Sequence, residues 1–202
     1  VMLELNENTW SGSALMPDGV SPGRVAFPVF LEDSFGARTI YTGGLGNDIS
    51  FNVLNEPPVI SPSIYIRTDS INELEEYLDS VVLPISGDPI TQVLEVSVSD
   101  PDGVSVVQSK IGRLAPIGSS NAWLNMNDDG INGDKFAGDG IYSLEFNARS
   151  SLEPGLMEIR IRATDIYQSM TPLEEQNRQI SLVKEESPNS SSWLGSNTDI
   201  LA

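Results

Sequence analysis

The sequence predicts an all-β protein built from antiparallel β-sandwiches, and three observations on its 202 residues support this prediction. Short segments in which apolar and polar residues alternate recur along the chain, as half-buried strands require. Turn signals of Gly, Pro and Asp separate these segments about every 8–12 residues. Residues 10–39 also resemble residues 142–171, which indicates two copies of one β module.

The repeat aligns Trp10 with Tyr142, an offset of 132 (142 − 10), and runs without a gap to Thr39 and Thr171. In each copy a Pro-Gly turn signal precedes the alternating apolar residues of a strand. An aspartate and, two residues later, an aromatic residue follow the strand. The matched residues are Pro22-Gly23 with Pro154-Gly155, Val25 with Met157, Phe27 with Ile159, Val29 with Ile161, Asp33 with Asp165, and Phe35 with Tyr167.

The two copies differ in how much sequence precedes them: nine residues before Trp10, but 85 (142 − 57) from Pro57 to Tyr142. We therefore expect residues 1–55 to be the C-terminal half of a module and residues 56–183 to be a complete module. Pro57-Pro58 predicts a stiff link between them. The missing strands are expected before Val1 in a longer polypeptide. The alternative is a strand from another chain, added at the open edge.

Within residues 56–183, most expected elements are strands bounded by turn residues. Residues 71–79 are the exception, because Ile71, Leu74 and Leu78 fall on one face of a short helix with Ser70 as its cap. The expected strands are residues 63–68, 92–100, 105–111, 121–126, 141–148, 156–165 and 179–183. Residues 184–202 are rich in Ser and Asn and predict a linker; the alternative is a juxtamembrane stretch whose anchor lies beyond Ala202.

The composition excludes several classes of partner and chemistry. With 11 basic and 29 acidic residues the net charge is −18, so a nucleic-acid partner is excluded and an anionic membrane surface is disfavoured. There is no cysteine and no histidine, which removes disulfides, thiolate nucleophiles and the commonest general base. No apolar run approaches the ~18 residues that span a bilayer, and no signal peptide is recognisable at Val1.

The segment NDDGINGDKFAGDGIYS, residues 127–143, concentrates aspartate and glycine. Calcium binds about six to eight oxygen ligands, and a loop that supplies them must fold back through glycine, Asn or Asp at positive φ. One interpretation is an EF-type loop. Its opening residues are Asn125, Asn127, Asp129 and Gly130. The match is partial, because Phe136 stands where glutamate is required and Asp134 would have to supply the late carboxylate.

Three stretches resemble the extracellular immunoglobulin-like modules of bacteria and archaea. Residues 96–107 (VSVSDPDGVSVV) are similar to their strand–turn–strand, and residues 55–60 (NEPPVI) to the junction that opens a following module. Residues 127–143 resemble an acidic loop found in a subset of them. The resemblance implies tandem Ig-like β-sandwiches, the first one partial, in a cell-surface or secreted protein. The positions that match the acidic signature, and that would be its metal ligands, are Asp128, Asp129, Asn132, Asp134 and Asp139.

Calcium (Ca²⁺) in this loop would relieve the repulsion between neighbouring carboxylates, roughly 1 kcal/mol per pair when screened. Its affinity would be weak, on the order of 0.1–1 mM, as in extracellular modules. The ion would make the module rigid. The alternative is a solvated acidic turn in which the aspartates accept hydrogen bonds from backbone amides.

Other acidic and aromatic residues have simpler structural interpretations. A type I turn with Pro101 at its second position accounts for Asp100 and Asp102. The acidic run in residues 73–79 is expected on a solvated helix face, although paired glycosidase carboxylates are the alternative. Trp10 and Trp123 are expected in cores or domain contacts; the alternative is that Trp10, Trp123 and Trp193 form a platform that stacks on sugars.

We therefore expect a non-catalytic structural or adhesive spacer of a cell-surface or secreted protein. Its partners would be an unknown surface ligand or neighbouring modules of the same chain. One alternative is a carbohydrate- or polymer-binding accessory module of a secreted enzyme. Another is a subunit of a surface filament or layer that exchanges strands with a neighbouring chain. No enzymatic activity is expected, since no nucleophile–base pair stands out.

Overall fold

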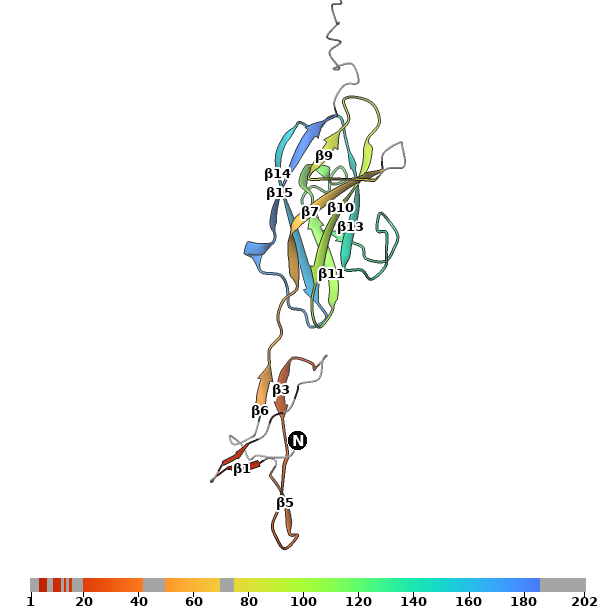
Figure 1. Ribbon diagram of the computed structural model, residues 1–202. Helices are drawn as coiled ribbons and strands as arrows, with labels where there is room; N and C mark the ends of the chain where they lie inside the picture. The colour runs from red at the N-terminus through yellow and green to blue at the C-terminus, as the bar shows by residue number, and fades with distance from the viewer. Residues whose placement is uncertain are drawn as a thin grey trace, which may run out of the picture. The chain divides into compact units, whose positions relative to one another are not determined.

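The computed structural model of the chain describes residues 4–6, 9–11, 13, 15, 20–41, 50–69 and 75–185. The chain divides into two compact units, Val1–Glu56 (unit 1) and Pro57–Ala202 (unit 2). The described residues form strands and two short 3₁₀ turns, Gly112–Leu114 and Leu173–Glu175, and no α-helix (Figure 1). The predicted all-β class is confirmed.

Unit 2 contains a four-stranded antiparallel sheet in the order β13-β10-β7-β8. Its strands are β7 (Val59–Asp69), β8 (Glu75–Leu78), β10 (Ile90–Ser99) and β13 (Ile141–Ala148). The inner strand β10 is buried on both faces from Gln92 to Val96. One face of β10 packs against the core, so another segment of unit 2 must cover its opposite face.

The second sheet of unit 2 has five strands in the order β12-β11-β14-β15-β9. They are β9 (Ser80–Leu83), β11 (Val104–Lys110), β12 (Leu124–Met126), β14 (Gly155–Asp165) and β15 (Asn177–Lys184). The sheet is mixed, because β9 runs parallel to β15 while the other pairs are antiparallel.

The two sheets of unit 2 share one hydrophobic core. Figure 1 shows β14 and β15 on one side of the unit and β7, β10 and β13 on the other. Leu94 of β10 and Phe146 of β13 belong to the same buried cluster as Ile161 of β14 and Leu182 of β15. Each such side chain, removed from water, contributes about 1.5–3 kcal/mol. The alternation seen in the sequence therefore serves a core between two layers.

The sequence prediction of a helix over residues 71–79 is wrong for residues 75–78. They form strand β8, in which Leu78 pairs with Ile66 and Tyr77 with Arg67 of β7. The available edge of β7 supplies hydrogen-bond partners that outweigh a weak local helix preference. Residues 70–74, including the proposed cap Ser70, lie outside the described residues, as do residues 186–202 of the expected linker.

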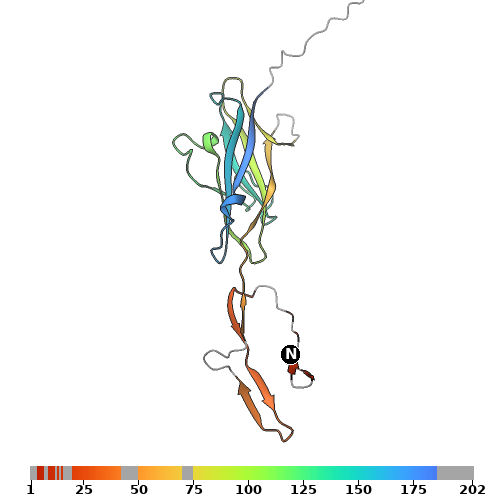
Figure 2. The ribbon, with the colours of Figure 1, turned by 90° about the vertical axis from the view of Figure 1, so that its left-hand side faces the viewer.

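The described residues of unit 1 form three two-stranded antiparallel sheets. They pair β1 (Glu4–Asn6) with β2 (Thr9–Ser11), β3 (Gly23–Ala26) with β6 (Ser50–Val53), and β4 (Val29–Glu32) with β5 (Arg38–Tyr41). The β4–β5 hairpin is the long hairpin at the lower end of Figure 2.

The repeated segments share their local geometry. Asp33 Oδ1 accepts hydrogen bonds from the backbone N–H groups of Phe35 and Ala37, at 2.8 and 2.9 Å. In unit 2, Asp165 Oδ1 accepts the equivalent bonds from Tyr167 and Ser169, both at 2.8 Å. Gly36 and Gln168, which the repeat aligns with each other inside these two turns, both have positive φ, at 82° and 72°. The same turn therefore follows the repeated strand in each unit.

Candidate metal centre

The acidic loop occupies residues 127–140 and connects β12 to β13, the edge strands of the two sheets of unit 2. A two-residue bridge closes its base: the N–H of Asn127 donates to Ser143 O, and the N–H of Ser143 donates to Asn127 O, both at 2.8 Å. The loop is the teal segment beside β13 in Figure 1. Both of its ends are thus fixed to the sheets.

The loop packs on the outer face of the four-stranded sheet. A Cβ added to Gly133 would lie 3.2 Å from Val93 Cγ2 of β10, so the backbone approaches the strand as closely as glycine allows. The N–H of Val98 donates to Gly140 O at 2.9 Å. These contacts explain why Val93 is buried although it faces away from the core.

A buried ion pair lies beneath the loop. Arg67 Nε of β7 donates to Glu95 Oε1 of β10 at 2.7 Å, and both side chains are almost fully removed from solvent. Arg67 Nη2 also donates to the carbonyl oxygen of Gly133 in the loop. Because an unpaired charge at this depth is costly, each partner needs the other. The pair ties the acidic loop to two strands.

Three carboxylates converge in the loop. One oxygen from each of Asp128, Asp134 and Asp139 lies within 4.8 Å of the others. Asp134 is buried, Asp128 is half-buried and Asp139 is exposed. The structure therefore brings together three of the five residues that the acidic signature selects, and this cluster can hold a metal ion.

Backbone amides and a hydroxyl fix these carboxylates. Asp128 Oδ1 accepts from the N–H groups of Gly138 and Asp139 at 2.8 and 3.1 Å, and its Oδ2 accepts from Gly140 at 3.2 Å. Asp134 Oδ2 accepts from the N–H of Gly130 at 2.6 Å, and its Oδ1 from the hydroxyl of Ser143 at 3.3 Å. The bonds that the acidic-turn alternative requires are thus present. Asp128 Oδ1 accepts two hydrogen bonds, whereas Asp128 Oδ2 and both oxygens of Asp134 accept one each and retain lone-pair capacity for a cation.

The other two signature residues have local roles. Asp129 is exposed, and its Oδ1 accepts a hydrogen bond from the N–H of Ile131 at 3.2 Å. Asn132 has a φ of 53°, the left-handed conformation that Asn tolerates better than most residues. Asp129 lies outside the carboxylate cluster, and Asn132 provides a bend in the loop.

The first two residues of the EF-type pattern lie in or beside the sheet. Asn125 belongs to β12, and its Oδ1 accepts a hydrogen bond from Gln108 Nε2 of β11 at 2.8 Å. Asn127 forms the bridge to Ser143 at the base of the loop. The carboxylates that converge, Asp128, Asp134 and Asp139, come from the start, middle and end of the loop, and all three belong to the acidic signature.

Burial and the loop charge act on a neighbouring tyrosine. Burial raises the pKa of the Tyr142 phenol above its usual value, and the negative charge of Asp128 raises this pKa further. Both effects disfavour the phenolate, since it would be poorly hydrated and close to another anion. Tyr142 therefore reports on the charge of Asp128.

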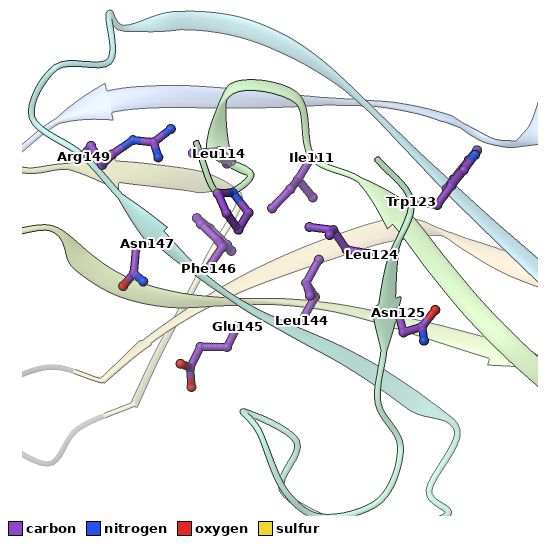
Figure 3. Close-up of a pocket in the computed structure, with 11 residues that line it drawn as sticks. Ile111, Leu114, Trp123, Leu124, Asn125, Leu144, Glu145, Phe146, Asn147 and Arg149 are labelled. Carbon is purple, nitrogen blue, oxygen red and sulfur yellow. The ribbon is translucent and has the colours of Figure 1, made fainter. Parts of the chain in front are cut away.

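A pocket of about 490 Å³ lies between the edge strands β12 and β13, away from the carboxylates. Figure 3 shows Ile111, Leu124 and Leu144 pointing into it, with Trp123 set apart at one end. The Arg162 guanidinium lies 4.0 Å from the centre of the Trp123 ring, and Lys110 Nζ lies 4.9 Å from it. A cation–π contact therefore occupies this tryptophan.

The remaining acidic and aromatic residues considered as binding sites either have structural roles or lie outside the described residues. Asp100 Oδ1 accepts from the N–H groups of Asp102 and Gly103 at 2.8 and 3.1 Å, which holds the expected turn between β10 and β11. The side chains of Trp10 and of residues 75–77, and all of Trp193, lie outside the described residues.

Sequence reasoning missed the residues that support the loop from below, Arg67, Val93, Glu95 and Ser143. Glu95 stands at an outward position of an alternating strand, where a solvated carboxylate is the normal expectation. Only the fold of the loop over the sheet buries it. The sequence contains no local signal for that contact.

Comparison of the sequence with models of protein families and with curated proteins finds no significant match. None of the helical turns in the described ranges has the length and hydropathy of a membrane-spanning helix.

Proposed function

We propose that this chain is a non-catalytic structural or adhesive spacer of a cell-surface or secreted protein, and that calcium makes it rigid at the acidic loop. The observation that supports this most is the convergence of Asp128, Asp134 and Asp139 in a loop that is anchored to both sheets. A cation there would cross-link the loop in a chain that has no cysteine for disulfides. The three carboxylates would supply part of its oxygen shell, with backbone carbonyls and water as the usual remaining ligands.

We also propose that unit 2 is an Ig-like β-sandwich. The strand order supports this assignment, since β7, β10 and β13 would correspond to strands A, B and E of the immunoglobulin fold. In the other sheet, β11, β14 and β15 would correspond to strands C, F and G. The acidic loop then stands where strand D would connect the sheets. Unit 1 would be the corresponding C-terminal half of a second module, in keeping with the shared turn at Asp33 and Asp165.

A thermal melt with calcium and then with excess chelator tests the proposal. With a dissociation constant on the order of 0.1–1 mM, ~10 mM calcium would stabilise unit 2 by about 1.4–2.7 kcal/mol. We expect Tm to rise by roughly 4–10 °C. Asp134→Asn should abolish this rise, whereas Asp129→Asn, which removes the same charge outside the cluster, should retain it. Equal melts with calcium and chelator would overturn the calcium part of the proposal.

A second candidate function, a carbohydrate- or polymer-binding accessory module, has the pocket between β12 and β13 in its favour. Its volume falls within the ~300–1,000 Å³ typical of ligand sites. A sugar would have to enter the pocket itself, because Arg162 already lies against the Trp123 ring. Binding of soluble oligosaccharides that is lost in Leu144→Trp, which fills the pocket, would favour this function. No binding to the unaltered chain would count against it.

A further inference from the structure

The two sheets of unit 2 differ in charge. The strands of the four-stranded sheet carry five acidic residues and one basic residue, which are Asp69, Glu75, Glu76, Glu95, Glu145 and Arg67. The strands of the five-stranded sheet carry five basic and two acidic residues, which are Lys110, Arg160, Arg162, Arg178, Lys184, Glu158 and Asp165. In a chain of net charge −18, positive charge is thus concentrated on one sheet.

Three of these cations, Lys110, Arg160 and Arg162, lie together on the outer surface of the five-stranded sheet and are called the basic face. Lys110 of β11 pairs directly with Arg160 of β14, and Arg162 follows two residues later on the same side of β14. The alternate residues of β14 are buried in the core, so these side chains face outward. Arg178 and Lys184 instead donate hydrogen bonds to backbone carbonyl oxygens.

The like charges of the basic face are only partly compensated. Lys110 and Arg160 stand directly opposite each other, an arrangement that destabilises a sheet. Glu158 Oε1 lies 3.3 Å from Arg160 Nε, but both side chains are more than half exposed, so the pair is weak. In the described part of the chain, neither Lys110 nor Arg162 forms an ion pair with a carboxylate. A bound anion would reduce this repulsion.

Neutral groups hold two of the cations in place. Arg162 Nε and Nη2 donate to Gln108 Oε1 at 3.0 and 2.6 Å, and the guanidinium lies against the ring of Trp123. Lys110 Nζ donates to Asn121 Oδ1 at 3.3 Å and lies 4.9 Å from the centre of the same ring. Because these side chains are ordered before a ligand arrives, binding costs less conformational entropy.

The surroundings of the basic face favour an acidic sugar as its ligand. Lys110 and Arg160 line an open polar hollow of about 240 Å³, smaller than the ~300–1,000 Å³ of a complete ligand site but suited to one anionic group. Amide side chains flank the cations, since Asn125 pairs with Gln108 and Asn177 pairs with Arg160. Amides both donate and accept hydrogen bonds, as sugar hydroxyls require. The acidic surface elsewhere limits the contact to a short stretch of an anionic chain.

We propose that the basic face binds a short stretch of an acidic polysaccharide. A carboxylate of the sugar would lie in the hollow between Lys110 and Arg160, with Arg162 beside it, and the amides would bind hydroxyl groups. This inference rests on the adhesive part of the proposed function, for which it names the class of surface ligand, and it does not involve the calcium site.

Calorimetric titration of the full chain with a galacturonate hexamer, in excess chelator, tests this proposal. We expect saturable binding in ~0.05 M NaCl that is at least about tenfold weaker in ~0.5 M NaCl, because salt screens exposed charges. The methyl-esterified hexamer has the same sugar chain without the negative charges and should not bind. Hexaglutamate, which carries carboxylates on a polypeptide, should bind more weakly than the galacturonate.

Two substitutions should change the affinity in opposite directions. Arg160→Gln should weaken binding about fivefold, and Glu158→Gln should strengthen it about fivefold, because a unit charge ~4 Å from an anion contributes about that factor in water. A gain of affinity cannot arise from misfolding. Arg38→Gln, which removes the same charge from an exposed pair of unit 1, should leave the affinity unchanged.

Three results would overturn the proposal. The first is no binding of the galacturonate at low salt. The second is equal binding of the methyl-esterified hexamer or of hexaglutamate, because the face would then not select an acidic sugar. The third is self-association at low salt that Arg160→Gln abolishes, because the occupant would then be the acidic surface of a second copy. The calcium melt is independent of all three, so failure of the basic face and failure of the calcium site are distinguishable.

Discussion

Units 1 and 2 contain the same local structures in different surroundings. Each has an aspartate turn after the repeated strand, and each has an Arg–Glu pair with an N···O distance of 2.7 Å. The Arg38–Glu32 side chains of unit 1 are 78% and 52% exposed, whereas those of Arg67 and Glu95 in unit 2 are 6% and 7% exposed. Local sequence therefore determines the aspartate turns, whereas the Arg67–Glu95 pair joins residues 28 positions apart on two strands. Burial by the surrounding strands and loop determines how much each pair contributes to stability.

The two ion pairs should show the largest difference. Arg67→Met leaves Glu95 buried without its partner, and we expect a loss of about 3–5 kcal/mol in the free energy of unfolding of unit 2. Arg38→Met breaks a solvated pair and should cost about 0–1 kcal/mol. Urea unfolding followed by hydrogen exchange in each unit measures both. Equal losses would show that burial does not control the difference.

The aligned core positions provide the next comparison. Ile161 is fully buried in unit 2, and Ile161→Ala should destabilise that unit by about 2–5 kcal/mol through lost burial and a cavity. Its counterpart Val29 is only half-buried, and Val29→Ala should cost less than about 1 kcal/mol. A large loss at Val29, measured by the same unfolding assay, would mean that residues 1–55 already form a packed core.

Alanine substitutions at two glycines of the acidic loop distinguish the cost of backbone strain from the cost of steric overlap with β10. Gly133 and Gly138 both have positive φ, so alanine at either position should cost about 1 kcal/mol. A methyl at Gly133 would also press on Val93, whereas nothing lies within 4 Å of one at Gly138. We expect Gly133→Ala to lower the stability of unit 2 by about 1–3 kcal/mol more. Equal effects in chemical denaturation would contradict close packing of the loop on β10.

The smallest expected effect is a pH dependence at Tyr142. The pKa of the Tyr142 phenol is raised in the folded protein, so the protonated phenol favours the folded state of unit 2. This contribution to stability is fully present below pH ~10 and is lost as pH rises further. The unfolded chain releases the proton first, which fixes this sign. In chelator, an ultraviolet titration of the phenolate, compared with Tyr142→Phe, should show a high pKa that Asp128→Asn lowers. An unshifted tyrosine would contradict the burial of Tyr142 beside Asp128.

Much of the fold of unit 2 could be predicted from local patterns. The alternating runs at residues 92–100, 105–111 and 156–165 correspond to β10, β11 and β14, because a period of two is dictated by the pleat itself. The resemblance to the acidic loop likewise selected five positions, of which Asp128, Asp134 and Asp139 converge. Both signals are local, so they can be read without knowing the fold.

The errors and omissions arose from contacts between distant residues. The helix expected over residues 71–79 failed because the edge of β7 was available to residues 75–78. The parallel strand β9 pairs with β15, about a hundred residues later in the chain, and no local pattern encodes that pairing. Arg67 and Glu95 become a buried pair only when the acidic loop folds over them.

The most direct test of the central claim is calorimetric titration of calcium into the chain. The account predicts one ion bound at Asp128, Asp134 and Asp139 with a dissociation constant on the order of 0.1–1 mM. Asp139→Asn should weaken this binding at least about tenfold, because it removes a ligand charge from an exposed position. Asp129→Asn should leave it nearly unchanged. No heat of binding in the unaltered chain, or equal loss in the two variants, would contradict a calcium site at this cluster.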